Sequence, residues 1–212
     1  MTFSVPVYEG YASPKSIVSL NLGGRHLDEY LNKILLGLGY EFTTSLELEL
    51  VSKIKEQLCI MREEAKFKPN PMDYKVYNLP DDSIVRISKE RYDIPEAIFN
   101  PSLIDIKEDG IHEVLFKSIL RCPEDLQNEM YGNIILSGGN TLFENFKKRL
   151  LGEITELNQG KNVIDIIDTK ERLYSSWIGG SILGQMDTFP EICISRKEFK
   201  ECGCSIIHDK TY

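Results

Sequence analysis

The chain has 212 residues, of which 42% are hydrophobic and 27% are charged, as in one large globular domain or two small ones. Its formal net charge of −8 argues against general binding to nucleic acid or to a membrane surface, since both require a basic face. No apolar stretch approaches the roughly 20 residues that span a bilayer, and we expect no secretory signal at the N-terminus. The five cysteines have no framework spacing, which indicates reduced thiols without a metal site, in a cytoplasmic or nuclear setting.

Predicted strands and helices alternate along the chain, which is typical of the α/β class. Apolar runs bounded by turn residues predict the strands, and apolar spacings of three and four residues predict the helices. Thr43 or Thr44 is placed to cap the second helix, and Gly39 to end the first. Prolines interrupt residues 91–105, so we expect irregular structure there around the apolar group Ala97-Ile98-Phe99. The expected strands are residues 4–8, 16–22, 74–79, 83–87, 133–136 and 161–167, and the expected helices are residues 27–38, 44–61, 111–121, 124–129, 141–154 and 174–186.

The stretch NIILSGGNTLFENFKKRLL, residues 133–151, combines a short strand, a double-glycine turn and an amphipathic helix. Thr141 and Glu144 have the spacing of a capping box, so we expect the helix to begin at Thr141. The N-terminus of a helix behind glycines is suited to bind an anion such as phosphate, because its first N–H groups are unpaired. An ordinary strand-to-helix turn, whose glycines only allow a positive φ, is the alternative.

Seven segments follow one another in a fixed order from residue 5 to the end of the chain. They are VPVYEGYASPKSIVSLNLGGRHLDEYLNKIL, IKEQLC, IPEAIFNPSL, GIHEVLFKSILRC, NIILSGGNTLF, YSSWIGGSIL and the tail ISRKEF…CGCSIIHDKTY. In this order and over nearly the whole length, the chain resembles the C-terminal half of an actin or actin-related protein.

The resemblance implies an α/β fold of the actin-like ATPase type, a ribonuclease H-like sheet with helices, from which the N-terminal half is missing. Residues 1–22 and 107–174 would form an incomplete third subdomain, residues 23–106 the fourth subdomain, and residues 175–212 the C-terminal part of the first. The family binds ATP or ADP with Mg²⁺, and the residues that order the attacking water and the metal lie upstream of this stretch. We therefore expect no competent hydrolysis by this chain alone.

The resemblance also implies a set of nucleotide contacts around the double-glycine turn and a lysine-glutamate pair. Ser52 replaces an arginine of the family, Leu173 a lysine and Phe3 a histidine, whereas Arg172 is retained. The implied contacts are Gly24, Lys55, Glu56, Gly138, Gly139, Asn140, Leu142 and Phe143. From the residues alone, Lys55 and Glu56 could instead be a solvated helix face, and Leu142 and Phe143 plain core.

Partner contacts are implied in two apolar groups. One matches the hydrophobic groove in which actin-binding proteins dock a helix, unless Ile182, Leu183 and Met186 line the core. The other matches a plug between filament strands, and we expect it to be exposed. The first group is Gly10, Ile178, Ile182, Leu183, Met186, Thr188 and Ile192, and the second is Ile98, Phe99 and Leu103.

The leading hypothesis is a cytoskeletal, actin-like structural protein of the cytoplasm, with the nucleus as a second location. Its partners would be actin-like protomers and actin-binding proteins. Two alternatives remain: an actin-related scaffold that does not bind or does not hydrolyse nucleotide, and a sugar-kinase-like enzyme of the same ATPase fold. The kinase would need a catalytic carboxylate at a cleft between domains, and the sequence shows none so placed.

Overall fold

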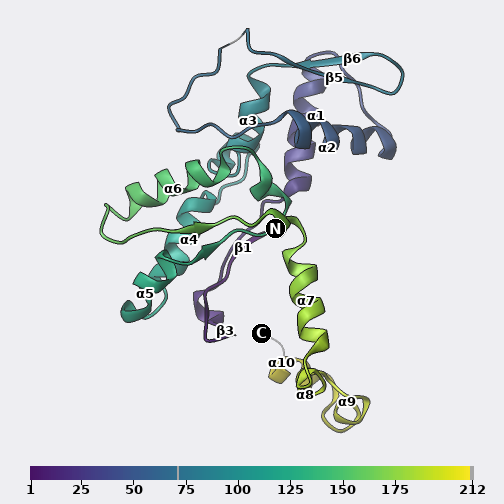
Figure 1. The fold of residues 1–212 in the computed structure, drawn as a ribbon. Coiled ribbons are helices and arrows are strands. Elements are labelled where there is room, and N and C mark those ends of the chain that lie inside the picture. Colours follow the sequence, from purple (N-terminus) through teal and green to yellow (C-terminus); the bar gives the residue numbers. More distant parts are fainter. Residues whose placement is uncertain (71, 211–212) are drawn as a thin grey trace.

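The computed structural model describes residues 1–70 and 72–210, as helices with short strands interspersed along the chain (Figure 1). The strands are β1 (Thr2–Ser4), β2 (Val7–Tyr8), β3 (Tyr11–Ala12), β4 (Val18–Leu20), β5 (Lys75–Asn78), β6 (Ile84–Ile87), β7 (Ile134–Ile135) and β8 (Ile166–Ile167). The helices are α1 (Gly24–Gly37), α2 (Ser45–Leu58), α3 (Glu90–Glu96), α4 (Ile111–Leu120), α5 (Glu124–Tyr131), α6 (Phe146–Leu157), α7 (Ser175–Gln185), α8 (Phe189–Ile192), α9 (Arg196–Cys202) and α10 (Ile206–Lys210). The α/β class predicted from the sequence is confirmed.

All strands of the described residues pair in twos. The β1–β4, β2–β3 and β5–β6 pairs are antiparallel, and β7 lies parallel to β8 with Ile134 opposite Ile166. The expected larger sheet is therefore wrong for this part of the molecule. Because β1 and β7 each pair with one neighbour only, each leaves one edge without a strand partner.

Local signals predicted the first two helices and the hairpin correctly. Thr44 accepts a hydrogen bond from the Glu47 N–H and the Glu47 side chain reaches back, which completes a capping box at α2. Gly39 follows α1 and has a φ of +91°, and a glycine with a positive φ commonly ends a helix. The strands β5 and β6 flank the predicted turn at Pro80-Asp81-Asp82.

The helix α3 lies where irregular structure was expected. Pro95 near its end has no N–H to donate to the carbonyl of Arg91, which would ordinarily break the helix. That carbonyl instead accepts the N–H of Ile60, at 3.0 Å. A distant segment thus satisfies the acceptor that the proline leaves free, and the helix continues to Glu96.

The helix α6 begins at Phe146, five residues later than expected, so the predicted capping box at Thr141 is wrong. Thr141 donates its hydroxyl to the Gly138 carbonyl instead, at 2.7 Å, within a 3-10 turn over Gly139–Leu142. The Glu144 carbonyl accepts the N–H of Met61 at 3.0 Å. Residues 143–145 form a turn before the helix, in which Asn145 has φ +66° and the Phe146 N–H donates to the Phe143 carbonyl.

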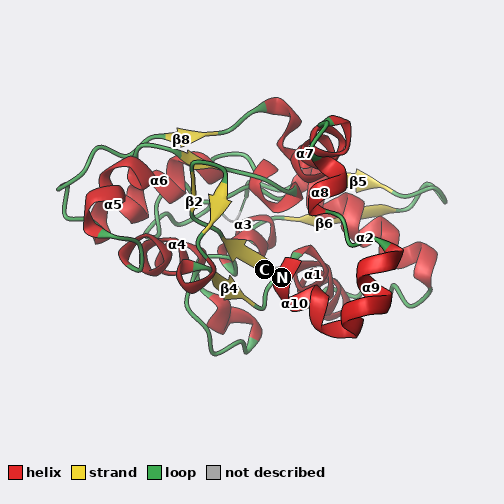
Figure 2. Cartoon of the chain, turned by 90° about the horizontal axis from the view of Figure 1, so that it is seen from below, coloured by secondary structure: helices red, strands yellow, loops and turns green. Residues whose placement is uncertain are grey.

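A single apolar core joins two groups of helices. In the first group, Leu27, Leu31 and Leu35 of α1 pack against α2 and α3. In the second, α4 packs against α6, whose Leu150 and Ile154 are fully buried. In Figure 1 the group of α1, α2 and α3 lies above the group of α4 and α6. Figure 2 shows the same helices from below.

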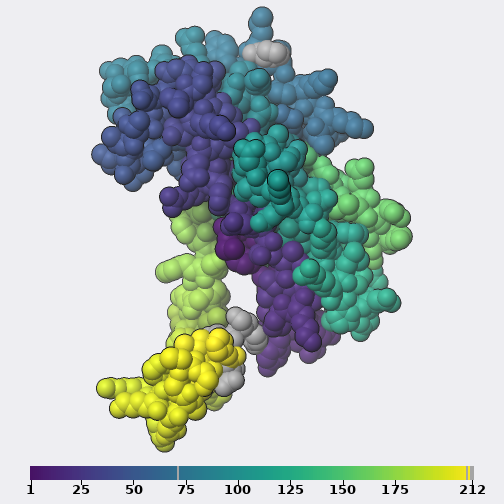
Figure 3. Space-filling view, turned by 180° about the vertical axis from the view of Figure 1, so that it is seen from behind, coloured from purple at the N-terminus to yellow at the C-terminus, as the bar shows by residue number. Residues whose placement is uncertain are grey.

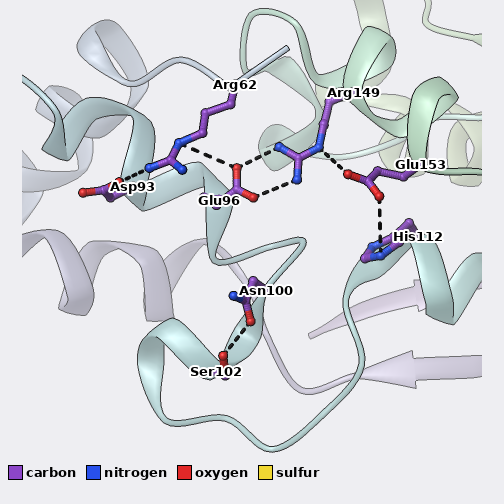
Figure 4. A network of polar contacts seen from close by, with 8 residues as sticks. All are labelled: Arg62, Asp93, Glu96, Asn100, Ser102, His112, Arg149 and Glu153. Carbon is purple, nitrogen blue, oxygen red and sulfur yellow. Dashed lines mark hydrogen bonds and ion pairs between the residues drawn. The ribbon is translucent and has the colours of Figure 1, made fainter. Parts of the chain in front are cut away.

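A buried polar network connects the two groups (Figure 4). Glu96 of α3 accepts two parallel hydrogen bonds from the Arg149 guanidinium of α6, at 2.7 and 2.8 Å. Arg149 also donates to Glu153 at 2.7 Å, and Arg62 pairs with Asp93 at the other end. The side chains of Arg149 and Glu96 are only 4% and 10% exposed, so this pair is desolvated.

The network reaches α4 through His112. Its Nε2 lies 3.9 Å from the Glu153 carboxylate, and its ring stacks on Phe99 at 5.6 Å between centroids. Burial lowers the pKa of His112, although the Glu153 carboxylate acts in the opposite direction. The Arg149 guanidinium also lies against Phe99, at 4.7 Å, so this ring has a charged and an aromatic neighbour.

The helices α7 to α10 form an arm that stands away from the body, as the space-filling view from behind shows (Figure 3). No residue of α7 is buried. At the far end Lys210 donates to Glu198 and to the carbonyl of Cys193, each at 2.8 Å, which ties α10 to α9.

We expect Glu96→Gln to lower the free energy of unfolding by about 1–3 kcal/mol, because it removes the buried two-hydrogen-bond partner of the Arg149 guanidinium and leaves it with the Glu153 carboxylate. Urea denaturation followed by circular dichroism measures this change. Lys148→Met is the control, since it removes the exposed partner of Glu63 and should cost less than about 1 kcal/mol. Equal losses in the two variants would contradict a dominant role for the buried pair.

Candidate functional site

A cleft of about 1450 Å³ lies between the N-terminal segment, the start of α1, the cleft face of α2 and the double-glycine turn. Side chains of α4 and α6, including Leu115 and Phe146, also line it. Its volume exceeds the roughly 300–1,000 Å³ of ordinary small-molecule sites. The cleft therefore has room for more than one small ligand or chain segment.

All eight residues predicted as nucleotide contacts line this cleft. They come from three places in the sequence: the start of α1, one face of α2, and the turn with the residues that follow it. They are Gly24, Lys55, Glu56, Gly138, Gly139, Asn140, Leu142 and Phe143. Ser52 and Leu173, where the chain departs from the actin pattern, lie at the same cleft.

Lys55 is buried against α1, which contradicts the alternative of a fully solvated helix face. Its ammonium group donates to the Gly24 carbonyl at 3.3 Å and lies 2.7 Å from Asp28 Oδ1. Glu56, the next residue, is exposed. On the side of the cleft formed by α2, the Lys55 ammonium is therefore a donor held in place, and the Glu56 carboxylate is exposed.

The double-glycine turn offers backbone donors without a helix behind it. Gly138 has φ +92° and donates its N–H to the Arg172 carbonyl at 2.8 Å. The N–H groups of Gly139 and Asn140 begin the 3-10 turn and make no hydrogen bond with another backbone group of the described residues. The expected anion site at an α-helix N-terminus is wrong, because α6 begins at Phe146, but two backbone donors remain at the turn.

Gly24 permits a close approach between α1, the glycine turn and Lys55. A Cβ atom there would lie 3.3 Å from Asn140 Oδ1 and 3.5 Å from Lys55 Nζ. A side chain at this position would occupy the space between α1 and the turn. The absence of a side chain keeps this part of the cleft open to a ligand.

The apolar part of the cleft divides between ligand-accessible surface and core. Leu142 and Leu173 are exposed, whereas Phe143 is buried and belongs to the central core. Leu173 lies beside the turn, with its Cδ1 3.5 Å from the place of a Cβ on Gly139. Phe143 therefore belongs to the core and also lines the cleft, whereas the alternative that Leu142 is plain core is wrong.

Of the residues implied as partner contacts, those from Ile182 onward are exposed. Ile182 is 60% exposed and Ile192 56%, while Leu183, Met186 and Thr188 are also exposed. The alternative that Ile182, Leu183 and Met186 line the core is therefore wrong. Ile178 is half-buried and Gly10 is exposed.

The second apolar group does not form the expected exposed surface. Ile98 and Phe99 are buried in the core, where Phe99 packs on His112 and Phe146. The sequence showed three apolar residues near a proline but not that α4 and α6 cover two of them. Leu103 alone remains exposed.

Asp28 and Ser176 line the cleft but were not among the predicted residues. Asp28 lies one helical turn after Gly24 on α1, so it shares the face of Gly24. Helical spacing from Gly24 was the signal that could have identified it. Ser176 carries no comparable signal.

Two searches of the described residues bear on other kinds of site. Within residues 1–70 and 72–210, no three His, Cys, Asp or Glu side chains are grouped so that they could hold a metal ion. In the same part of the chain, no helix has the length and apolar character needed to cross a bilayer.

The fold and the cleft define an α/β protein in which a glycine turn and the helices α1 and α2 border a large cleft. Comparison with protein-family models gives a match to the family described as Actin over residues 1–212, the whole chain. The chain therefore belongs to the actin family. This confirms the family to which the seven sequence segments pointed.

We expect the thiol of Cys59, directly after α2, to resist alkylation in the native protein. Burial raises its pKa to about 12, so at pH 8 the reactive thiolate is almost absent. Iodoacetamide labelling followed by peptide mass spectrometry should modify the exposed Cys202 and Cys204 first, and Cys59 only after denaturation. Equally fast labelling of Cys59 in folded protein would show that α2 does not pack as described.

Proposed function

We propose that the chain is an actin-like cytoskeletal protein that contributes one side of a binding cleft for ATP or ADP with Mg²⁺. The observation that carries this proposal is the meeting of all eight implied contacts at one cleft, from three separate parts of the sequence. Membership of the actin family supports the same assignment. Under this proposal the protein works in the cytoplasm, with the nucleus as a second location.

The two walls of the cleft suit different parts of a nucleotide. The Lys55 ammonium and the Glu56 carboxylate supply a donor and an acceptor for ribose hydroxyls, and Leu142 gives apolar surface to the base. The N–H groups of Gly139 and Asn140 are the donors available to phosphate oxygens. Bound Mg²⁺ would neutralise phosphate charge, and we assign it no ligands among the described residues.

We further propose that this chain supplies only one half of the site and does not hydrolyse nucleotide by itself. Residues of β1 and of β7 line the cleft, and each of these strands has one edge without a strand partner. Ile135 of β7 is 69% exposed and Phe3 of β1 56%. Unpaired strand edges with apolar side chains favour a further polypeptide segment, which would complete the opposite wall.

The proposed division into subdomains follows the family. Residues 1–22 and 107–174 would form the third subdomain, residues 23–106 the fourth, and residues 175–212 part of the first. The grouping of α1, α2 and α3 apart from α4 and α6 supports the division between residues 23–106 and residues 107–174. The arm that projects from α7 onward supports the boundary between residues 174 and 175.

We propose that the exposed apolar side of α7 is a contact surface for actin-like protomers or actin-binding proteins. Ile182, Leu183 and Met186 give it a surface suited to the apolar face of a helix. Leu103 is a second candidate contact, whereas Ile98 and Phe99 are buried and are no longer proposed as contacts.

We expect the 212-residue chain to bind Mg·ADP with a Kd of about 1 mM or tighter, and Gly24→Val to weaken this at least about tenfold. The valine side chain would fill the gap beside Asn140 and Lys55. Isothermal titration calorimetry measures both affinities. Gly152→Val is the matched control, because this helical glycine has no heavy atom within 4 Å of its Cβ position.

An actin-related scaffold without nucleotide is the second candidate, and the exposed Leu173 beside Gly139 favours it. Under this alternative, wild-type protein shows no binding heat at millimolar Mg·ADP or Mg·ATP. A kinase of the same fold would instead phosphorylate a small metabolite in a broad substrate screen.

We expect Ile182→Asp to weaken binding of an amphipathic helical peptide from an actin-binding protein by at least about tenfold. A charge in the middle of an apolar contact would remain without a partner in the complex. Fluorescence anisotropy of the labelled peptide gives the affinity. Ser181→Asp introduces the same charge at the neighbouring exposed position, and an equal loss there would contradict a specific role for Ile182.

A further inference from the structure

The position of Lys55 depends on a carboxylate that belongs to another helix. Asp28 Oδ1 lies 2.7 Å from Lys55 Nζ, and the two side chains are 26% and 6% exposed. A buried ammonium group requires a counter-charge. Among the described residues, no other carboxylate lies within ion-pair distance of Lys55.

Two groups of α1 hold the ammonium from one side of the cleft. Asp28 and Gly24 are four residues apart, so the carboxylate and the Gly24 carbonyl lie on one face of the helix. The carbonyl accepts a hydrogen bond from Nζ at 3.3 Å. Asp28 Oδ1, in contrast, has no well-directed hydrogen bond despite its short distance, so Coulomb attraction is its main tie to Lys55.

The ammonium lies where α1 approaches the glycine turn. The position of a Cβ on Gly24 is 3.5 Å from Lys55 Nζ and 3.3 Å from Asn140 Oδ1. A lysine side chain has a flexible four-carbon stem, and its charge alone does not fix where it points. Asp28 supplies the constraint that the stem lacks.

We propose that Asp28 is a positioning residue of the cleft, which holds Lys55 against Gly24 and cancels its charge. The neutral pair then favours an uncharged acceptor of the ligand, such as a hydroxyl oxygen, over a phosphate at this wall. The inference rests on the proposed nucleotide function for its ligand. The placement of Lys55 by Asp28 can also be tested without any ligand.

A double-mutant cycle tests the ligand part, with adenosine and Mg·ADP as probes in calorimetry. Asp28→Asn should weaken adenosine binding about tenfold and Mg·ADP binding less, because the released ammonium can turn toward the phosphates. In a Lys55→Met background, Asp28→Asn should change either affinity by less than about twofold, since it acts through Lys55. Additive losses, as a merely structural role would give, overturn the proposal. Glu29→Gln, at a neighbouring exposed residue of α1, is the control and should leave both affinities unchanged.

Nitrogen-15 NMR of the lysine ammonium groups tests the placement itself. A buried, bonded ammonium exchanges its protons slowly, so Lys55 should give a resolved signal in the wild type and in Asp28→Glu, and none in Asp28→Asn. The Asp28→Glu variant keeps the carboxylate, so a signal in it shows that a substitution at residue 28 does not by itself abolish the signal. Circular dichroism of Asp28→Asn shows whether that variant is folded. If the signal behaves in this way but no nucleotide binds, the proposed function fails and the placement by Asp28 stands. If Asp28→Asn is folded and keeps the signal, the inference is overturned.

Discussion

The buried pair between Glu96 and Arg149 is the interaction on which the arrangement of the cleft depends. It joins α3 to α6 with two parallel hydrogen bonds, and Phe99 packs beneath the guanidinium. Since α3 packs on α1 and α2, the pair sets the distance between the helix that carries Lys55 and the segment that carries the glycine turn. Neither charge could remain buried alone, so the two helix groups are constrained to move together.

Sequence patterns predicted the elements that are stabilised locally. The capping box at Thr44 and the glycine after α1 involve residues within one turn of the helix end, and the structure has both. The two main errors, the missed α3 and the early start given to α6, share one cause. The segment Ile60–Met61 donates its N–H groups to the carbonyls of Arg91 and Glu144, which completes one helix and delays the other. A contact across 30 to 80 positions of sequence leaves no periodic signal, so tertiary structure overrides local preference here.

The candidate site was easier to predict than the surfaces. Family resemblance located eight residues that line one cleft, because a glycine turn and a lysine-glutamate pair can be recognised from the sequence without knowledge of the structure. It failed for Ile98 and Phe99, since an apolar residue near a proline has the same appearance in a core as at an interface. It missed Asp28 because the function of this residue depends on where Lys55 turns, and that direction exists only once α1 and α2 have packed.

The geometry of the turn limits where binding energy can come from. Without an α-helix behind Gly138 and Gly139, the macrodipole of α6 contributes little at the turn, and two backbone N–H groups remain as donors. The Lys55 charge is already balanced by Asp28, so it adds little net attraction for phosphate. For the proposed nucleotide, the sugar and the base would therefore provide most of the affinity on this side. Tight phosphate binding would then require further groups, and β1 and β7, which line the cleft with one edge unpaired, offer places where another segment could supply them.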